Sequence, residues 1–170
     1  MEIRVVRSKK RKKTVSARVE DGTMIVRAPA FISGKELRKI IENFRKRFER
    51  KELKKRLNRE KPPEDVFNRL NRKYFDGKLR INSIQYVTSQ RSLYGSCSLS
   101  SGNIRISHKV AEMPSWVRDY VFMHEMAHLI EPNHGRSFWS IVNRYSLTER
   151  ARGFLIAKGI ESAGEDDRNG

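Results

Sequence analysis

Three of the chain's four histidines lie in one short stretch, His124-Glu125-Met126-Ala127-His128 followed by His134. In a helix, the first two of these histidines lie one turn apart on the same face, with Cβ atoms about 5–6 Å apart. At that separation both imidazoles can bind one tetrahedral metal ion at about 2.0–2.1 Å. Glu125 would point about a quarter-turn away, where it can act on a water molecule at the metal without becoming a ligand. The spacing therefore predicts a helix whose buried face holds a metal ion.

The residues around this stretch favour a metal site over ordinary core histidines. Val117 and Val121 would share a face with the first two histidines, so without a metal the imidazoles would be unpaired on an apolar stripe. His134 follows a break at Pro132-Asn133 and can turn back as the third ligand. Three protein ligands leave a fourth position for water, which is typical of catalytic rather than structural zinc. The sequence thus predicts one Zn²⁺ per chain, held by His124, His128 and His134, with Glu125 as the catalytic base.

Length and composition narrow the class of protein. The 170 residues suit one domain, or one domain with a small appendage. We see no apolar N-terminal run typical of a secretory signal and no stretch near the ~18 apolar residues of a membrane span. A single cysteine, Cys97, excludes an internal disulfide framework and a cysteine-rich zinc module. We therefore expect a cytoplasmic protein, with nucleoid association or a nuclear location as further options, that is not secreted and has no membrane partner.

The net charge of +17 is unevenly distributed along the chain. Residues 1–61 contain 22 Lys and Arg against 8 Asp and Glu, whereas residues 62–170 contain 15 against 12. The positive charge therefore belongs to the N-terminal third and not to the histidine stretch. Such an asymmetry indicates an acidic partner, most often nucleic acid.

The N-terminal third, residues 1–61, is predicted to combine strands with a basic helix. Apolar residues alternate at 3–7, 15–19 and 24–28, and Asp21-Gly22 is a hairpin turn signal. We expect a small antiparallel β-meander, with the basic run 9–13 in the loop between its first two strands. Ser33 and Glu36 form a capping box that begins the basic helix, and Pro62-Pro63 ends it and marks the domain boundary.

Residues 62–159 are predicted to form an α+β core. A helix begins after Pro63 and stops at Asp76-Gly77, and strands follow at 84–88, 94–99 and 103–106. The histidine helix is expected over about 114–130, with a short helix from Phe138 and a last helix from Thr148 to Gly159. Residues 160–170, which are acidic, are expected to be a disordered tail.

Ordered motifs run through this core: Phe67-Asn68, Tyr74-Phe75-Asp76-Gly77-Lys78-Leu79, Gly95-Ser96-Cys97, Ile104-Arg105-Ile106-Ser107, the stretch 124–128, Asn133-His134-Gly135 and Phe138-Trp139. Together they resemble the SprT-like and YgjP-like (WLM-related) zinc metallopeptidases. The SprT-like resemblance covers about residues 66–146, and the YgjP-like one extends over nearly the whole chain. It implies a zincin-like core with a small mixed sheet and an active-site helix, a zinc ion, and peptide-bond hydrolysis. SprT-like members are further associated with degrading proteins trapped on DNA.

Carried over residue by residue, the resemblance assigns His124, His128 and His134 as metal ligands and Glu125 as general base. Two departures concern the motifs. YgjP-like members usually have Trp before Gly-Ser-Cys, where this chain has Tyr94. The ligand spacing equals that of metzincins, but Glu131 replaces their glycine and no methionine follows His134, so we do not expect a metzincin.

Further side chains are candidates for contacts with the substrate. Sites of this kind usually have a second donor to the developing oxyanion, and Tyr94, Arg91 and Tyr145 are candidates among which the sequence does not choose; ordinary packing is the alternative for each tyrosine. By analogy with the family's architecture, 103–107 would be a sheet edge on which a substrate binds as an added strand, with Ile104 at its centre. Cys97 is expected to be a buried structural thiol, with modulation of the metal as the alternative.

The basic third has its own candidates. A basic run and one face of the helix would contact nucleic-acid phosphates without reading sequence, because no aromatic residue interleaves the run. The alternatives are a solvated surface, an acidic protein or a membrane surface. These residues are Lys9, Lys10, Arg11, Lys12, Lys13, Lys46, Arg50 and Lys54.

Three functions follow from these features. The first is a zinc-dependent endopeptidase that hydrolyses peptide bonds by a Glu-activated, zinc-bound water, acts on a protein or peptide substrate, and is directed to DNA-associated proteins such as DNA–protein crosslinks. The second is a nucleic-acid-binding module whose peptidase site is latent or vestigial. The third is a zinc hydrolase that acts on a non-protein amide. The intact Glu125 favours an active enzyme, because metal binding alone does not need it.

Overall fold

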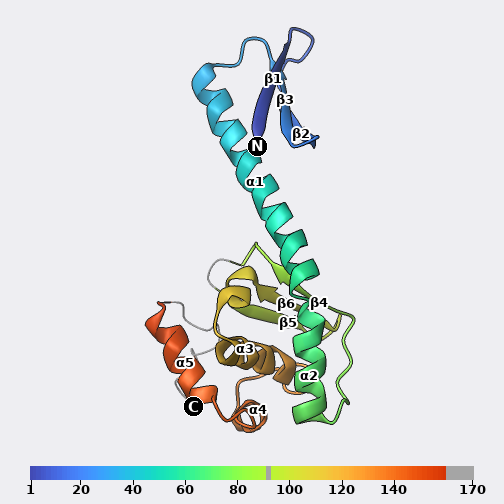
Figure 1. Ribbon diagram of the computed structural model, residues 1–170, viewed down its shortest axis with the longest axis vertical. Coiled ribbons are helices and arrows are strands. Elements are labelled where there is room, and N and C mark those ends of the chain that lie inside the picture. The colour runs from blue at the N-terminus through green and yellow to red at the C-terminus, as the bar shows by residue number, and fades with distance from the viewer. Residues whose placement is uncertain (91–92, 160–170) are drawn as a thin grey trace. The chain divides into compact units, whose positions relative to one another are not determined.

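Residues 1–90 and 93–159 are described by the computed structural model, which divides into two units, Met1–Glu52 and Leu53–Gly170. Helix α1 (Gly34–Glu60) contributes to both units, which are described separately below (Figure 1). In the described ranges, no helix has the length and apolar character needed to cross a membrane. The expected tail 160–170 and the candidate Arg91 lie outside the described residues.

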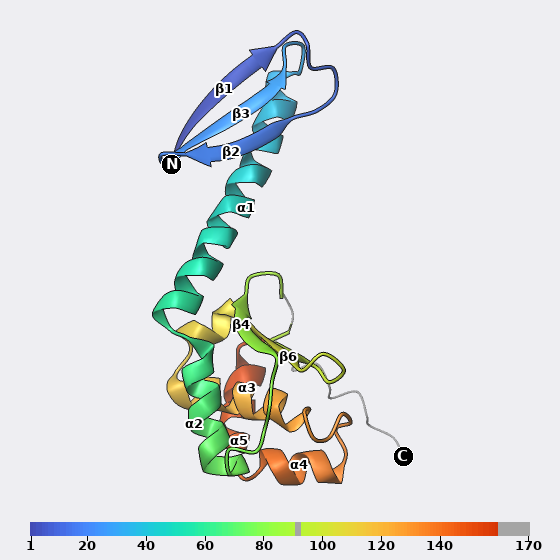
Figure 2. The ribbon, with the colours of Figure 1, turned by 90° about the vertical axis from the view of Figure 1, so that its right-hand side faces the viewer.

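The N-terminal unit contains a three-stranded sheet made of β1 (Glu2–Ser8), β2 (Ser16–Glu20) and β3 (Thr23–Pro29). The order is β1-β3-β2, with β1 parallel to β3 and β2 antiparallel to it (Figure 2). The expected antiparallel meander is therefore wrong in its order, although the β2–β3 hairpin turns at Asp21-Gly22, both with positive φ. Strand β3 lies at the centre of this sheet. Its Met24, Val26 and Ala28 are fully buried, whereas β1 is exposed along most of its length.

The first part of α1 packs on this sheet. As predicted, Ser33 caps the helix, since its hydroxyl accepts a hydrogen bond of 3.2 Å from the Glu36 backbone N–H. Leu37 is buried with the three β3 side chains, and Ile41 and Phe44 pack at the margin of the same cluster. The predicted helical stripe thus forms the apolar contact that holds this unit together.

The second unit contains a mixed sheet made of β4 (Ser83–Val87), β5 (Gly95–Ser98) and β6 (Asn103–Ser107). The order is β4-β6-β5, with β4 parallel and β5 antiparallel to β6. The expectation that 103–107 is a sheet edge is wrong: β6 is paired on both sides, and Ile104 is fully buried. The alternating Ile104 and Ile106 are buried where β6 forms the centre of the sheet. Strand β5, made of small residues, forms one of the two edges.

Helices cover this sheet. They are α2 (Pro63–Phe75), the 3₁₀ helix η1 (His108–Glu112), α3 (Ser115–Ala127), α4 (Arg136–Val142) and α5 (Thr148–Ala157). Helix α3 packs against β5 and β6, and α4 and α5 pack against α3 (Figure 1). It is slightly shorter than the predicted 114–130, and ten of its thirteen residues are buried. The α+β class, with a small mixed sheet and a helix that carries the histidine stretch, is confirmed.

Candidate active site

The three histidines of the predicted metal site come together at the C-terminal end of α3. Their candidate ligand atoms all lie within 4.8 Å of one another, and Nε2 of His124 is 3.1 Å from Nε2 of His134. Two nitrogens bound to one tetrahedral zinc ion would lie about 3.3 Å apart, given bonds of about 2.0–2.1 Å. A set of three imidazoles suits zinc or a similar transition metal rather than magnesium or calcium. The residues present therefore fit a zinc ion.

A backbone contact fixes the orientation of one of these rings. Nδ1–H of His128 donates a hydrogen bond of 3.3 Å to the carbonyl oxygen of Glu131, since a carbonyl can only accept. Nε2 of the neutral ring is then left with its lone pair, as a metal ligand requires. Glu131 occupies the position where the metzincin pattern has glycine, and its main chain orients the His128 ring.

Burial and the proximity of neighbouring imidazoles lower the pKa values of His124 and His128. Burial, followed by the proximity of His128 and His134, lowers the pKa of His124 to about 3. Burial is also the largest cause that lowers the pKa of His128. Neutral imidazoles carry the lone pairs that bind metal ions, so protons compete less well for this site than for ordinary histidines.

An aromatic wall that the sequence reasoning did not single out supports the cluster. The ring centroid of Phe138, on α4, lies 4.9 Å from that of His124 and 4.6 Å from those of both His128 and His134. Trp139 packs beside it, and Phe138 is fully buried. Because one ring touches all three imidazoles, α4 defines their mutual geometry. The Phe138-Trp139 pair within the ordered motifs was the available signal.

Glu125 lies next to the histidines and is almost completely buried, with 6% of its surface exposed. Burial raises the pKa of its carboxyl to about 8. It lines a cleft of about 240 Å³, together with His124, His128, Pro132 and the edge strand β5. A buried carboxyl group beside a metal-binding cluster and open to a cleft has the placement of a general base.

The edge strand approaches Glu125 closely, and only glycine permits this approach. A Cβ atom at Gly95 would lie 2.6 Å from both Cγ and Cδ of Glu125, which is well inside van der Waals contact. Gly95 is thus a site residue that the sequence analysis quoted only as part of a motif. Its missing side chain makes the space that the Glu125 carboxylate occupies.

The two predicted oxyanion donors that the structure describes, Tyr94 and Tyr145, lie at different distances from the histidine cluster. Tyr94 is buried and lines a small cavity of about 30 Å³ beside His124 and Glu125. Tyr145 does not join the cluster, because its hydroxyl donates a hydrogen bond of 3.0 Å to the Trp116 carbonyl. Trp116 and His124 are eight residues apart on α3, or about 12 Å along the helix. Burial, the largest cause, raises the pKa of Tyr145 to about 12, as expected for a structural hydroxyl.

Cys97 lines the cleft of about 240 Å³ at Glu125 and is half-buried. Burial, with a smaller contribution from Glu125, raises the pKa of its thiol to about 11.

The predicted nucleic-acid contacts lie on α1 and in the loop before β2. Lys9, Lys10, Lys12 and Lys13 are exposed, and Arg11 is half-buried. Arg50 is exposed and Lys54 is half-buried. Lys46 makes an ion pair of 3.6 Å with Glu42, so its positive charge is partly compensated.

Comparisons with known proteins agree with this geometry. The family profile described as "YgjP-like, metallopeptidase domain" matches residues 51–150. A search of the curated proteins found no match. Among solved structures, the metallopeptidase zymogen abylysin of Pyrococcus abyssi is similar with a TM-score of 0.51 and 19% identity. The similarity covers 58% of this chain and 96% of that one. At that identity it supports the zincin-like metallopeptidase fold and nothing finer.

The close approach of β5 predicts that Gly95→Ala impairs catalysis selectively. The added methyl group must displace the buried Glu125 carboxylate, so we expect hydrolysis to fall by roughly 10²-fold or more, the usual contribution of a general base, while bound zinc remains stoichiometric. The measurement is kcat with zinc content. Gly153→Ala on α5 is the matched control, because its Cβ would meet nothing within 4 Å. Equal activity of both variants would contradict the assignment.

The raised pKa of Cys97 predicts an unreactive thiol. A change from 9.0 to about 11 lowers the thiolate fraction at pH 8 by roughly 100-fold, and only the thiolate attacks alkylating agents. Iodoacetamide should therefore modify the native protein about 100 times more slowly than the urea-unfolded chain at pH 8, and the rate should rise as the pH approaches 11. Equal rates in the two states would show that the thiol is freely ionised.

Proposed function

This chain belongs to the YgjP-like metallopeptidase family, and we propose that it is a zinc-dependent endopeptidase of the H-E-x-x-H type. In this proposal, one zinc ion binds to His124, His128 and His134, and Glu125 is the general base. The observation that carries the proposal is the gathering of three imidazoles beside one buried carboxyl group that lines a cleft. That combination suits hydrolysis of a peptide bond by a metal-activated water molecule.

The residues of the chain then have separate tasks. When bound, the zinc ion supplies Lewis-acid polarisation of the scissile carbonyl and lowers the pKa of a water molecule to about 7. Glu125 accepts the proton of the attacking water and passes it to the leaving amine. Phe138 and the Glu131 carbonyl hold the imidazoles in place.

The edge strand β5 is the proposed docking site for the substrate. In the part of the chain that the structure describes, it pairs with β6 on one side only, and Gly95, Ser96 and Cys97 line the cleft beside His124 and Glu125. An extended peptide could add to this edge through main-chain hydrogen bonds, which makes cleavage tolerant of sequence. The proposed added strand therefore pairs with β5, whereas the sequence had led us to expect it at 103–107.

DNA-associated proteins, including DNA–protein crosslinks, are the proposed substrates. The support is the excess of 22 basic over 8 acidic residues in 1–61 and the exposure of Lys9, Lys10, Lys12 and Lys13. Contacts would be made with phosphates, so DNA would bring the enzyme to its substrates without selecting a sequence. The alternative, a nucleic-acid-binding module with a latent peptidase site, predicts DNA affinity without hydrolysis.

Glu125→Gln separates metal binding from catalysis. The amide cannot accept the proton of water, so we expect stoichiometric zinc in the purified variant but a loss of casein or histone cleavage by roughly 10²–10⁴-fold. His134→Ala should instead lose zinc and activity together. Zinc quantification and cleavage, each with and without single-stranded DNA, check both variants. A wild-type protein that binds zinc and DNA but cleaves neither protein would support the alternative.

Contacts with DNA phosphates predict a steep dependence of affinity on salt. The logarithm of the association constant for an oligonucleotide should fall linearly with the logarithm of the salt concentration, because phosphate contacts release counterions. Neutralising Lys9, Lys10, Lys12 and Lys13 together as glutamine should make the slope shallower by up to about 2.8–3.6, at roughly 0.7–0.9 per contact. A flat dependence in the wild-type protein would remove the DNA part of the proposal.

A further inference from the structure

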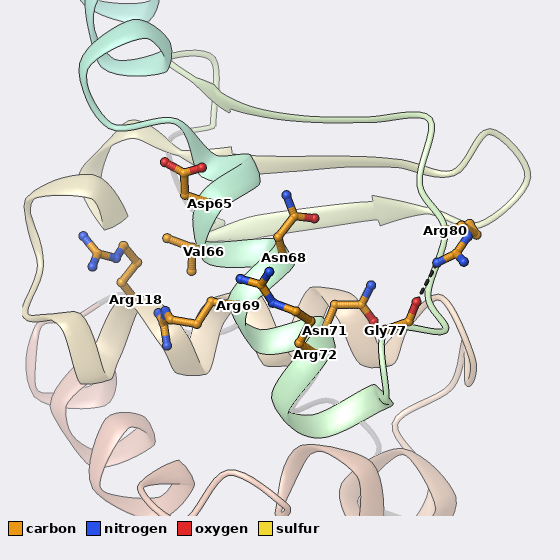
Figure 3. A pocket seen from close by; sticks show the side chains of 9 residues that line it. All are labelled: Asp65, Val66, Asn68, Arg69, Asn71, Arg72, Gly77, Arg80 and Arg118. Carbon is orange, nitrogen blue, oxygen red and sulfur yellow. Dashed lines mark hydrogen bonds between the residues drawn. The ribbon is translucent and has the colours of Figure 1, made fainter.

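A second concave site lies in the catalytic unit, away from the histidines. It is a cavity of about 730 Å³ between α2, the turn after α2 and the start of α3, and it shares no lining residue with the cleft at Glu125. Four arginines line it, and we call it the arginine pocket: Arg69, Arg72, Arg80 and Arg118. Figure 3 shows Arg69 and Arg118 at one end, from α2 and α3, and Arg80 at the other end beside Gly77.

The charge in this pocket is only partly compensated. Asp119 pairs with Arg69 at 2.6 Å, and Asp65 is the single carboxylate among the described residues that line the pocket. Within 1–90 and 93–159, neither Arg72 nor Arg118 makes an ion pair, and buried Nε of Arg118 has no hydrogen-bond partner. The excess is notable because residues 62–170 are nearly balanced, with 15 basic and 12 acidic residues.

Local contacts hold the pocket in shape. The Arg69–Asp119 pair connects α2 to α3, and the Asn71 side chain bonds both the N–H and the carbonyl of Leu79. Arg80 donates to the carbonyl oxygens of Gly77 at 2.6 Å and Leu79 at 3.1 Å. The turn is therefore fixed to the helix, and the guanidinium groups surround a formed hollow.

The chemistry of the lining identifies a class of ligand. Guanidinium groups bind phosphate oxygens through paired hydrogen bonds, and several of them around one hollow match more than one phosphate. The volume falls within the roughly 300–1,000 Å³ of small-ligand sites. None of the described residues that line the pocket is aromatic, so they offer no surface on which a base could stack. We propose that the arginine pocket binds consecutive phosphate groups of a polyanion, either a free polyphosphate or nucleotide, or the backbone of a nucleic acid. This site is separate from the basic run 9–13 and independent of the proposed peptidase activity.

The test measures binding of tripolyphosphate, ATP and a labelled single-stranded oligonucleotide to the full-length protein at 150 mM salt. Arg72→Gln with Arg118→Gln should weaken tripolyphosphate binding at least tenfold. Arg105→Gln is the matched control, because Arg105 is exposed in the same unit and does not line the pocket. Arg72→Gln alone, at an exposed position, gives a milder variant should the double variant fold poorly, and it should lose at least threefold.

Each result decides the proposal. A loss confined to the pocket variants supports it; equal losses in Arg105→Gln, or no tripolyphosphate binding by the wild-type protein, overturn it. If the pocket variants also bind the oligonucleotide less tightly, the phosphates are those of a nucleic acid. If only tripolyphosphate and ATP binding fall, the ligand is a free phosphate compound. Hydrolytic activity and melting temperature, which should stay near wild type, show that the variants remain folded.

Discussion

The burial of helix α3 is the constraint on which the candidate site depends. Ten of its thirteen residues are buried against the sheet, α4 and α5, so its C-terminal turn has little freedom. That packing sets the positions of His124 and Glu125. Burial is the largest cause of the pKa shift of each residue. The same apolar environment disfavours a proton on the imidazole and favours one on the carboxyl group. One physical effect, burial, thus accounts for both shifts although they have opposite signs.

The site also requires close contacts from elements distant in sequence. Strand β5 reaches Glu125 only because residue 95 has no side chain, and α4 brings one ring, Phe138, against all three imidazoles. Neither contact involves a hydrogen bond or a charge. Steric fit, by which close-packed interiors transmit position, therefore adds to the hydrogen bond between His128 and the Glu131 carbonyl in setting the geometry of the cluster.

Local signals in the sequence were sufficient for much of this structure. The cap at Ser33, the stop at Asp76-Gly77 and the helix through 124–127 depend on neighbouring residues, and all were predicted. The strand orders were not predicted, because strand pairing depends on contacts between distant segments. In both sheets the last strand in the sequence lies between the two earlier ones. For the same reason Ile104 was expected at an edge but lies at a centre, and Tyr145 reaches Trp116 rather than the cluster. The steric role of Gly95 is likewise visible only once β5 and α3 are placed together.

Net charge alone would have directed attention to one half of the chain. Residues 1–61 carry a large excess of basic residues, yet most are exposed and several are paired along α1, as Lys46 is with Glu42. The nearly balanced remainder contains the arginine pocket, where the positions of α2 and α3 concentrate guanidinium groups that are dispersed in sequence. A local field depends on where charges are gathered and on the concave, low-dielectric walls around them, not on their sum. The fold can therefore create a cationic site in a region whose composition gives no sign of one.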